Sequence, residues 1–478
     1  MAGSFTGGGF DLQPSAQQVP LATNYITDFN FLNQYLPDTY EKEFERYGNR
    51  TISSFLRLVG AEMPSNSDLV KWAEQGRLHI KYTQCGSTAA LNDDTAIIQV
   101  NDALVPNRAG VGLTAGDIAL REGQTVVIIQ NDGSGENKGI ITAMDLPNNR
   151  FTVAFYEVDG YVGAAGAFTD TNVTVFIYGS EFAKGQGGMV GSLEADDEIF
   201  ENNPIILKDR YAVSGSDMAQ IGWVEVTTEN GATGYLWYMK SEHETRLRFD
   251  DYLETAMVEA VPMANVANAA TANGTEGIFF AVSDRGNLWT GGVPSTLADF
   301  DTIIGRLDAQ GAIEENVLFL DRQFGFAIDD MLAAQNSYGA GGTSYGLFDN
   351  DEEMALNLGF SGFRRGYDFY KTDWKYLNDP TMRGGNNATG SGSGHINGLL
   401  VPAGSTSVYD QILGKNAKRP FLHVRYRASE TEDRRYKTWI TGSAGGAMTS
   451  DLDAMEVHFL SERCVCTMGA NNFVLFED

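Results

Sequence analysis

Few residues of this chain are spaced for catalysis or metal binding. The five histidines are scattered, without an H-E-x-x-H or H-x-E pairing: His79, His243, His395, His423 and His458. Cys464 and Cys466 fall in a strand-like run, so both sulfurs would face the same way. A zinc site needs about four ligands, and the chain has no second cysteine pair. We therefore expect buried free thiols, including Cys85, and neither a metal nor a cofactor.

Three further segments are similar to phosphate-binding, nucleophile or calcium-binding motifs but lack the spacing or the structural context that those motifs require. The segment 133–139 is glycine-rich like a phosphate loop, but a strand follows it where a helix N-terminus is needed, so a hairpin turn is predicted. The segment 359–362 lacks the G-x-S-x-G spacing of a nucleophile elbow. The acidic run 349–353 lacks the glycine and the distal glutamate of a calcium loop, and is better interpreted as a helix N-terminus. No catalytic residue is assigned, and we expect a protein that is not an enzyme.

Composition narrows the class of protein. The chain has 478 residues, 42% of them hydrophobic, and a formal charge of −29. That length predicts two or three sub-domains. The charge argues against a dedicated nucleic-acid binder and against attachment to an anionic membrane. We expect no signal peptide, because no Lys or Arg precedes Lys42, and no transmembrane helix; three cysteines fit a reducing cytoplasm.

The N-terminal third is predicted to change from helix to strand. Residues 1–22 are rich in Gly, Gln and Pro and are expected to become ordered only against a partner. Helices are predicted over 38–47, 51–59 and 67–75, the last ending at Gly76. From 81 to 172 the pattern predicts a compact inserted barrel or sandwich. Its clearest strands are 125–130, 139–144 and 150–156, with a turn at 145–149.

Residues 174–260 are predicted to form a β excursion that leads into one long helix. A strand at 174–178 meets a glycine-punctuated stretch, and Asn230-Gly231 predicts a hairpin. The helix is expected over 241–260, with Ser241 and Glu244 as a capping box. Its apolar face follows helical spacing: Phe249, Tyr252, Leu253, Ala256, Met257 and Ala260. A β-structured segment with few core residues of its own indicates an arm that reaches a neighbouring subunit.

The C-terminal half is predicted to be a mixed α/β unit followed by strands. We expect a strand at 277–282 and helices at 296–310 and 321–335. Residues 336–400 are predicted to be mostly turn, with a mobile loop at 384–394. The closing strands are expected at 420–426, 436–440, 454–460 and 472–476.

Two basic clusters interrupt the acidic background. The first holds Arg364 and Arg365 with Lys371 and Lys375; the second holds Arg425, Arg427, Arg434, Arg435 and Lys437. One interpretation is solvated surface, since acidic residues lie among the second group. The other is ion pairing between subunits, with Arg364, Arg365, Arg434 and Arg435 as candidates. The sequence leaves both open.

Several segments resemble a known family. The segments 178–185 and 213–216, with the long helix after them, are similar to the extended loop and spine helix of tailed-phage major capsid proteins, which have the Hong Kong 97 fold. The resemblance is closest to the crAss-like phages and rests on four blocks: 40–50, 71–77, 356–365 and 370–378.

This resemblance implies an α+β protein of the Hong Kong 97 type with a small β-rich insertion. The implied layout is an N-terminal arm at 1–36, a helical part of the peripheral domain at 37–80, the insertion at 81–172, the extended loop at 173–235, spine helix and peripheral domain at 236–284, axial domain at 285–424 and closing peripheral strands at 425–478. Phe182, Lys184 and Gly185 would then contact a neighbouring subunit. Some relatives join such a lysine to an asparagine by an isopeptide bond; a solvent-facing or salt-bridged Lys184 is the alternative.

The implied function is structural, namely to form a closed shell from many copies. Copies would associate as hexamers and pentamers into an icosahedral head around double-stranded DNA, without sequence-specific binding or a membrane. Portal and decoration proteins would be the other partners, and assembly would take place in the bacterial host cytoplasm before the protein resides in the virion capsid. The alternatives are an encapsulin-like compartment shell, a β-rich tail, fibre or adhesin protein, and an enzyme with an unrecognised site.

Overall fold

The computed structural model describes two short N-terminal pieces, 6–7 and 10–11, and most of 61–478. Its gaps after residue 61 are 77, 93, 101–113, 115, 134, 162–171, 192–196, 221–224, 228–232, 264–273, 312, 336–361, 380, 384–394, 411–414, 447 and 478. Contacts divide the chain into two units, Met1–Thr51 and Ile52–Asp478. In the first unit, β1 (Thr6–Gly7) pairs with β2 (Phe10–Asp11). The helices predicted over 38–47 and 51–59 lie outside the described residues. No helix that the structure describes is long and apolar enough to span a membrane.

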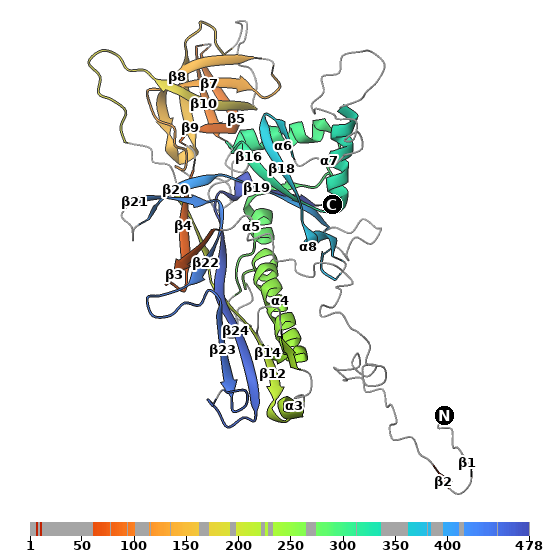
Figure 1. Cartoon of the computed structure of the whole chain (residues 1–478). Coiled ribbons are helices and arrows are strands. Elements are labelled where there is room, and N and C mark those ends of the chain that lie inside the picture. Colours follow the sequence, from red (N-terminus) through yellow and green to blue (C-terminus); the bar gives the residue numbers. More distant parts are fainter. Residues whose placement is uncertain are drawn as a thin grey trace. The chain divides into compact units, whose positions relative to one another are not determined.

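A closed six-stranded barrel occupies the predicted β-rich insertion (Figure 1). In barrel order its strands are β10 (Val173–Ser180), β5 (Lys81–Asn92), β6 (Thr95–Val100), β9 (Arg150–Phe155), β8 (Glu136–Asp145) and β7 (Gln124–Gln130), with the short helix η2 (Leu146–Asn148) between β8 and β9. Side chains alternate between the two faces of a strand, so Ile98, Phe151 and Val153 fill the interior. The segment 133–139 contributes to the β7–β8 hairpin turn, where the N–H of Gly133 donates to the carbonyl of Gln130 at 2.9 Å, as predicted.

The predicted boundary at residue 172 needs correction. β10 pairs with β5 on one side and with β7 on the other. The barrel therefore closes only when residues 173–180 are included, although the sequence places these residues at the start of the extended loop.

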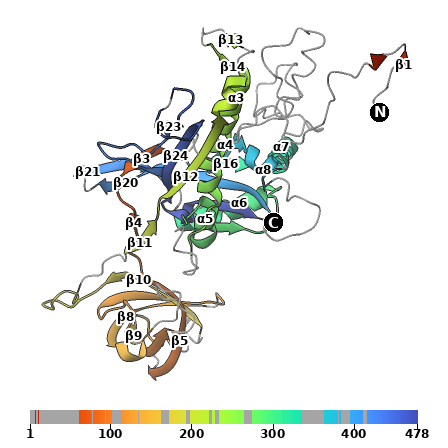
Figure 2. The same cartoon turned by 90° about the horizontal axis from the view of Figure 1, so that it is seen from below.

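A two-stranded ribbon carries the chain into and out of the barrel. β4 (Val70–Gln75) pairs antiparallel with β11 (Asp197–Asn202), and the two strands lie side by side in Figure 2. We call this ribbon the stem. The helix predicted over 67–75 is wrong, because a partner strand more than a hundred residues later in the chain pairs with this segment; long-range pairing overrides a local pattern. The described part of the predicted helical region 37–80 is thus β-structure.

A five-stranded sheet, which includes the longest described strand, lies beside the long helix. The sheet contains β12 (Ile205–Ser214), β24 (Ala454–Thr467), β22 (Leu422–Arg427), β3 (Ala61–Ser65) and β23 (Lys437–Gly442). β12 and β24 pair over the whole length of β12. The helix α4 (Leu236–Glu259) packs along this strand pair (Figure 1). It buries Phe249, Leu253 and Met257. Its predicted apolar face is confirmed in these three residues, whereas Tyr252 is exposed.

The predicted start of this helix is wrong. α4 begins at Leu236, so Ser241 and Glu244 lie within it and form no capping box. The carbonyl of Ser241 accepts a hydrogen bond from the hydroxyl of Thr245 at 2.9 Å, as a residue inside a helix does. The short helix α3 (Gly215–Gln220) and the hairpin of β13 (Glu225–Thr227) and β14 (Thr233–Tyr235) precede α4. The hairpin is confirmed, but its turn, with Asn230-Gly231, lies outside the described residues.

A six-stranded mixed sheet follows, and we call the five-stranded sheet, the six-stranded sheet and the helices packed on them the body. In order it contains β15 (Asn287–Trp289), β25 (Val474–Glu477), β19 (Ile396–Pro402), β16 (Glu315–Leu320), β18 (Tyr367–Asp373) and β17 (Gly362–Arg365). The helices α6 (Leu297–Gln310) and α7 (Arg322–Gln335) pack against it, and both were predicted. One apolar core joins α4 and both sheets through Met257, Phe319 and Val465. The C-terminal half of the chain also contains the hairpin of β20 (Ser405–Asp410) and β21 (Lys415–Pro420) and the short helix η5 (Ala470–Asn472).

Two further predictions need correction. Residues 277–282 were predicted as a strand but start α5 (Ile278–Arg285), because a short apolar run fits a buried helix as well as a buried strand. Residues 336–400 were predicted as mostly turn, yet they supply β17, β18, β19 and α8 (Lys375–Asn378). The segments 336–361 and 384–394 lie outside the described residues. The predicted closing strands are confirmed as β22, β23, β24 and β25.

Candidate assembly surfaces

The stem is attached to the body through a buried amide, that of Asn202. This side chain is 3% exposed. Its Nδ2 donates to the carbonyls of Glu276 at 2.9 Å and Val465 at 2.7 Å. Its Oδ1 accepts from the N–H of Glu276 at 2.8 Å and from the hydroxyl of Thr275 at 2.9 Å. Every hydrogen-bonding position of the amide is thus used, and one residue links β11 to β24 and to the segment before α5.

A second attachment of the stem is the guanidinium group of Arg285, at the end of α5. It lies 4.4 Å from the ring centroid of Phe200 and 5.9 Å from that of Trp72, one ring from each strand of the stem. It also pairs with Glu276 at 2.7 Å, and both side chains are mostly buried. A desolvated cation over aromatic faces and beside a carboxylate is held more strongly than an exposed ion pair. Arg285 therefore fixes the stem against the body.

The inward face of β4 completes this attachment. Glu74 accepts hydrogen bonds from the indole N–H of Trp72 at 3.0 Å and from the backbone N–H of Gly469 at 2.8 Å. Trp72 also packs against the cluster that contains Cys464 and Cys466. The two thiols lie together on one strand and are buried, as predicted, and Cys85 is buried in the barrel. Among the described residues no group of His, Cys, Asp and Glu side chains could hold a metal ion.

The residues predicted to contact a neighbouring subunit, Phe182, Lys184 and Gly185, lie in the turn after β10. The N–H of Glu181 donates to the carbonyl of Gly123 at 3.0 Å, which places this turn against the barrel. Phe182 is 38% exposed, Lys184 is exposed, and Gly185 has a φ of +87° that favours glycine. Contact with a neighbour and an isopeptide bond at Lys184 both stay predictions.

The four arginines predicted to pair between subunits all have carboxylate partners within the chain. Arg364 pairs with Asp368 at 3.2 Å, and Arg365 pairs with Asp301. Arg434 and Arg427 share Glu462, at 2.6 and 3.3 Å. Arg435 and the buried Arg463 share Glu62. Burial lowers the pKa of Arg463, and Glu62 opposes that effect.

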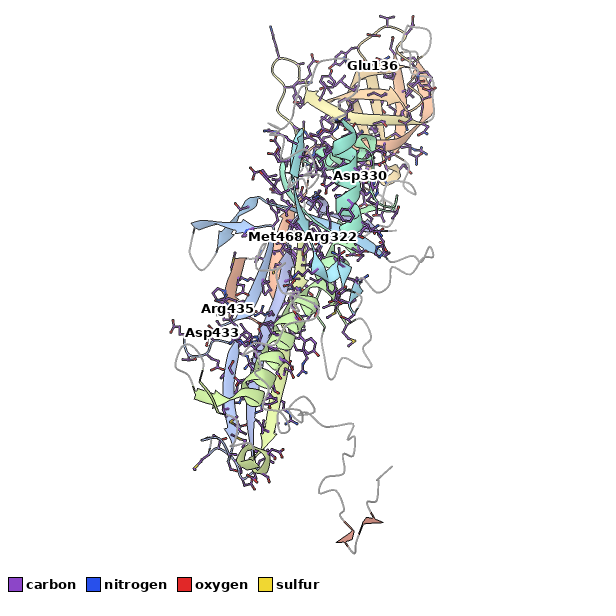
Figure 3. All side chains as sticks on the ribbon, turned by 45° about the vertical axis from the view of Figure 1, so that its right-hand side comes forward. Glu136, Arg322, Asp330, Asp433, Arg435 and Met468 are labelled. Carbon is purple, nitrogen blue, oxygen red and sulfur yellow. The ribbon has the colours of Figure 1, made fainter. Side chains whose placement is uncertain are left out.

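These pairs support the interpretation of the basic clusters as locally neutralised surface. Arg435 and its near neighbour Asp433 come from the turn between β22 and β23, and Figure 3 shows them close together. Pairing between subunits at the four arginines remains a prediction.

A shallow groove runs between α4 and β12. Its volume is about 400 Å³, and Leu207, Tyr252 and Ala256 contribute to its walls. Glu259 lies at one end, where it binds Arg383 and accepts a hydrogen bond from the hydroxyl of Tyr376. Burial and the hydrogen bond to Glu259 raise the pKa of Tyr376, so this hydroxyl stays a donor. The carboxylate is engaged in structural contacts and is not placed to act as a general base.

β12 is the longest edge strand of the five-stranded sheet. Among the described strands, β12 pairs only with β24. Its side chains alternate between half-buried and exposed, and Ile206 is 52% exposed. An edge strand presents unpaired N–H and C=O groups that another chain can pair with. Exposed Met448 and Leu452, in the β23–β24 connection, add apolar surface. These features are suited to contacts between proteins.

Comparison with known proteins gives the following result. No protein-family model and no curated protein matches the chain. Similar solved structures include one of Microbacterium phage Oxtober96 (TM-score 0.39, 10% identity, 92% of this chain and 95% of that chain). Another is the capsid of an empty GTA particle (TM-score 0.36, 10% identity, 95% of this chain and 99% of that chain). A third is the capsid of Cyanophage P-SCSP1u (TM-score 0.33, 10% identity, 63% of this chain and 79% of that chain). These TM-scores are too low for the likeness to carry an argument, so the proposal below rests on the chain's own elements.

Sequence reasoning missed the residues that attach the stem. Asn202 stands in an unremarkable acidic segment, and four of its hydrogen-bonding partners come from two distant parts of the chain. Trp72 and Phe200 offered one signal, since each is an aromatic residue within a short strand-like run. Nothing in the sequence indicated that Arg285 lies against both rings.

Proposed function

We propose that this chain is the major capsid protein of a tailed phage, with the Hong Kong 97 fold, and that it assembles into a closed shell around double-stranded DNA. The observation that carries the proposal is α4, a 24-residue helix packed along the β12–β24 pair, directly after a long β excursion. A helix this long, on a sheet with an open edge, is suited to repeated side-by-side contacts between copies.

The parts of the chain take roles in this proposal. α4 is the spine helix, and the five-stranded sheet beside it is the peripheral domain. The six-stranded sheet with α6 and α7 is the axial domain around the capsomer centre. The stem is the base of the extended loop, with the barrel inserted within it. This placement revises the layout inferred from the sequence, in which the insertion at 81–172 precedes the loop.

The finer assignments belong to the same proposal. The likeness to crAss-like phages rests on sequence blocks, of which 71–77 falls on β4 and 370–378 on β18 and α8. Hexamers and pentamers, a portal and decoration proteins follow from the role of a capsid subunit. The contacts of Phe182, Lys184 and Gly185 with a neighbour do so as well.

The proposal is tested by expressing the full chain and examining it by negative-stain electron microscopy and sedimentation. We expect closed particles or capsomer rings. A chain that stays monomeric at high concentration would overturn the proposal. Closed particles that hold protein cargo and no DNA in infected cells would favour a compartment shell instead.

A pair of variants tests whether the open edge of β12 is a contact between copies. Ile206→Asp places a charge beside the open edge of β12 and should reduce the yield of particles severalfold without unfolding the subunit. Leu146→Asp makes the same kind of change at a barrel residue that is 44% exposed, and serves as the matched control. Equal yields from the two variants would show that the β12 edge is not a contact.

A further inference from the structure

The outer wall of the barrel carries three exposed aromatic side chains, which we call the aromatic patch: Tyr156, Tyr178 and Phe182. Their exposed fractions are 48%, 51% and 38%. Tyr156 follows β9, Tyr178 is near the end of β10, and Phe182 is in the turn after β10. Exposed tyrosines, which are apolar with a hydroxyl at one end, and exposed apolar rings beside them are typical of binding surfaces.

Local contacts hold the patch in place. The backbone N–H of Tyr156 donates to the carbonyl of Lys138 at 3.0 Å, and its hydroxyl donates to Oε2 of Glu181 at 2.5 Å. Burial, the bond to Glu181 and the neighbouring Tyr178 raise the pKa of Tyr156, so its hydroxyl stays protonated. These contacts reduce the freedom that the Tyr156 ring would lose on binding a ligand.

Gly123 fixes the third ring. A Cβ atom at this position would lie 2.5 Å from the ring of Phe182, and the φ of Gly123 is +85°. A side chain larger than hydrogen therefore fits neither the space nor the backbone. Phe182 thus sits on the backbone of the barrel, next to the N–H of Glu181, which bonds to Gly123.

Charge limits the ligands that this surface can take. Residues 81–180 contain eleven acidic and five basic side chains, a net charge of −6, within a chain of −29. Anionic ligands, nucleic acid and a second copy of the same surface are all repelled. A neutral ligand rich in hydroxyl groups is not repelled, and it can donate to the carboxylate of Glu181.

We infer that the aromatic patch, with the carboxylate of Glu181, binds neutral hexose oligosaccharides. A pyranose ring has one face of C–H groups and a rim of hydroxyl groups. The rings of Tyr156 and Tyr178 supply flat apolar faces for the first, and Glu181 supplies an acceptor for the second. This activity adds to the proposed assembly function and does not depend on it, because the sugar contacts fall on Tyr156, Tyr178 and Glu181. Phe182 borders this site and is the one patch residue that also belongs to the proposed contact with a neighbour.

The test uses the full-length chain and two probes, maltoheptaose and cellohexaose. Saturation-transfer NMR should show contact with the ring protons of at least one probe. Calorimetry should then give a dissociation constant that Tyr178→Ala weakens about tenfold, the factor expected from losing one stacked ring. The control is Leu146→Ala, which also removes exposed apolar surface from the barrel and should leave binding unchanged.

Two outcomes overturn the inference. One is the absence of saturation transfer to either probe in the folded wild-type chain. The other is unchanged binding in the Tyr156→Ala/Tyr178→Ala double variant, with circular dichroism confirming that the double variant is folded. Sedimentation of the double variant tests a contact between copies. If the double variant no longer associates but still binds the sugar as the wild type does, the patch serves assembly. That result would again refute a saccharide site.

Discussion

The barrel and the stem are stabilised by different kinds of interaction. The barrel has a closed interior of its own, filled by side chains such as Ile98, Phe151 and Val153. The stem is a two-stranded ribbon, and an isolated ribbon of this size is marginal in water. It is stabilised by attachments to the body, above all through Asn202 and Arg285. The barrel is thus a self-contained unit, whereas the stem that carries it is ordered only through its contacts with the body.

This difference predicts separate responses to mutation. A change in the barrel interior should affect the barrel alone, because among the described strands those of the barrel pair only with each other. A change at the stem attachment should loosen the stem while the barrel stays folded. Hydrogen exchange measured peptide by peptide distinguishes the two, because regions open with their own free energies.

The largest effect is expected from Phe151→Ala. Phe151 is 1% exposed, and removing its ring should lower the free energy of unfolding of the barrel by about 3–5 kcal/mol. Exchange should accelerate in peptides from 81–100 and 124–155, and stay unchanged in α4 and β24. Leu146→Ala, at an exposed position of the barrel, is the control and should change little. Equal acceleration in α4 would show that barrel and body unfold as one unit.

A smaller effect is expected from Asn202→Ala. The substitution leaves the buried carbonyls of Glu276 and Val465 and the N–H of Glu276 without this partner, at a cost of about 1–3 kcal/mol. Exchange should accelerate in 70–75 and 197–202, while the barrel keeps its protection. Asn203→Ala changes the next, half-buried residue and should have little effect. If the barrel lost protection together with the stem, its independence would be refuted.

The sequence predicts the barrel far better than the stem, and the reason is contact distance. The strands at 125–130, 139–144 and 150–156 pair with near neighbours through short turns, so local patterns are sufficient to predict them. The stem pairs residues 70–75 with 197–202, and the intervening barrel hides that relation from any local pattern. The same limit explains the attachment site. The polar contacts of Asn202 exist only after three distant segments have met.

The smallest effect is a loss of stability with rising pH between pH 8 and 10, and it tests the separation of barrel and body further. Burial raises the pKa of Cys85 to about 12 from an ordinary value of 9.0. Below pH 9 the thiol is protonated in both the folded and the unfolded state, so its contribution to stability is fully present. Between pH 9 and 12 the unfolded chain loses this proton while the folded barrel keeps it. The free energy of unfolding of the barrel should therefore fall by up to about 1.4 kcal/mol per pH unit from this group.

Cys85→Ala should flatten that dependence in the barrel. The remaining slope would come from groups such as Tyr82, whose pKa burial also raises. In the body, a hydrogen bond with Cys464 and burial raise the pKa of Cys466, so the body should weaken with rising pH as well. Cys85→Ala should leave that second dependence untouched, because Cys85 belongs to the barrel core alone. Denaturant titrations at pH 8, 9 and 10, followed by exchange in both regions, measure the two slopes. A variant that flattened both slopes would mean that the two cores unfold together, and the separation between barrel and body would fail.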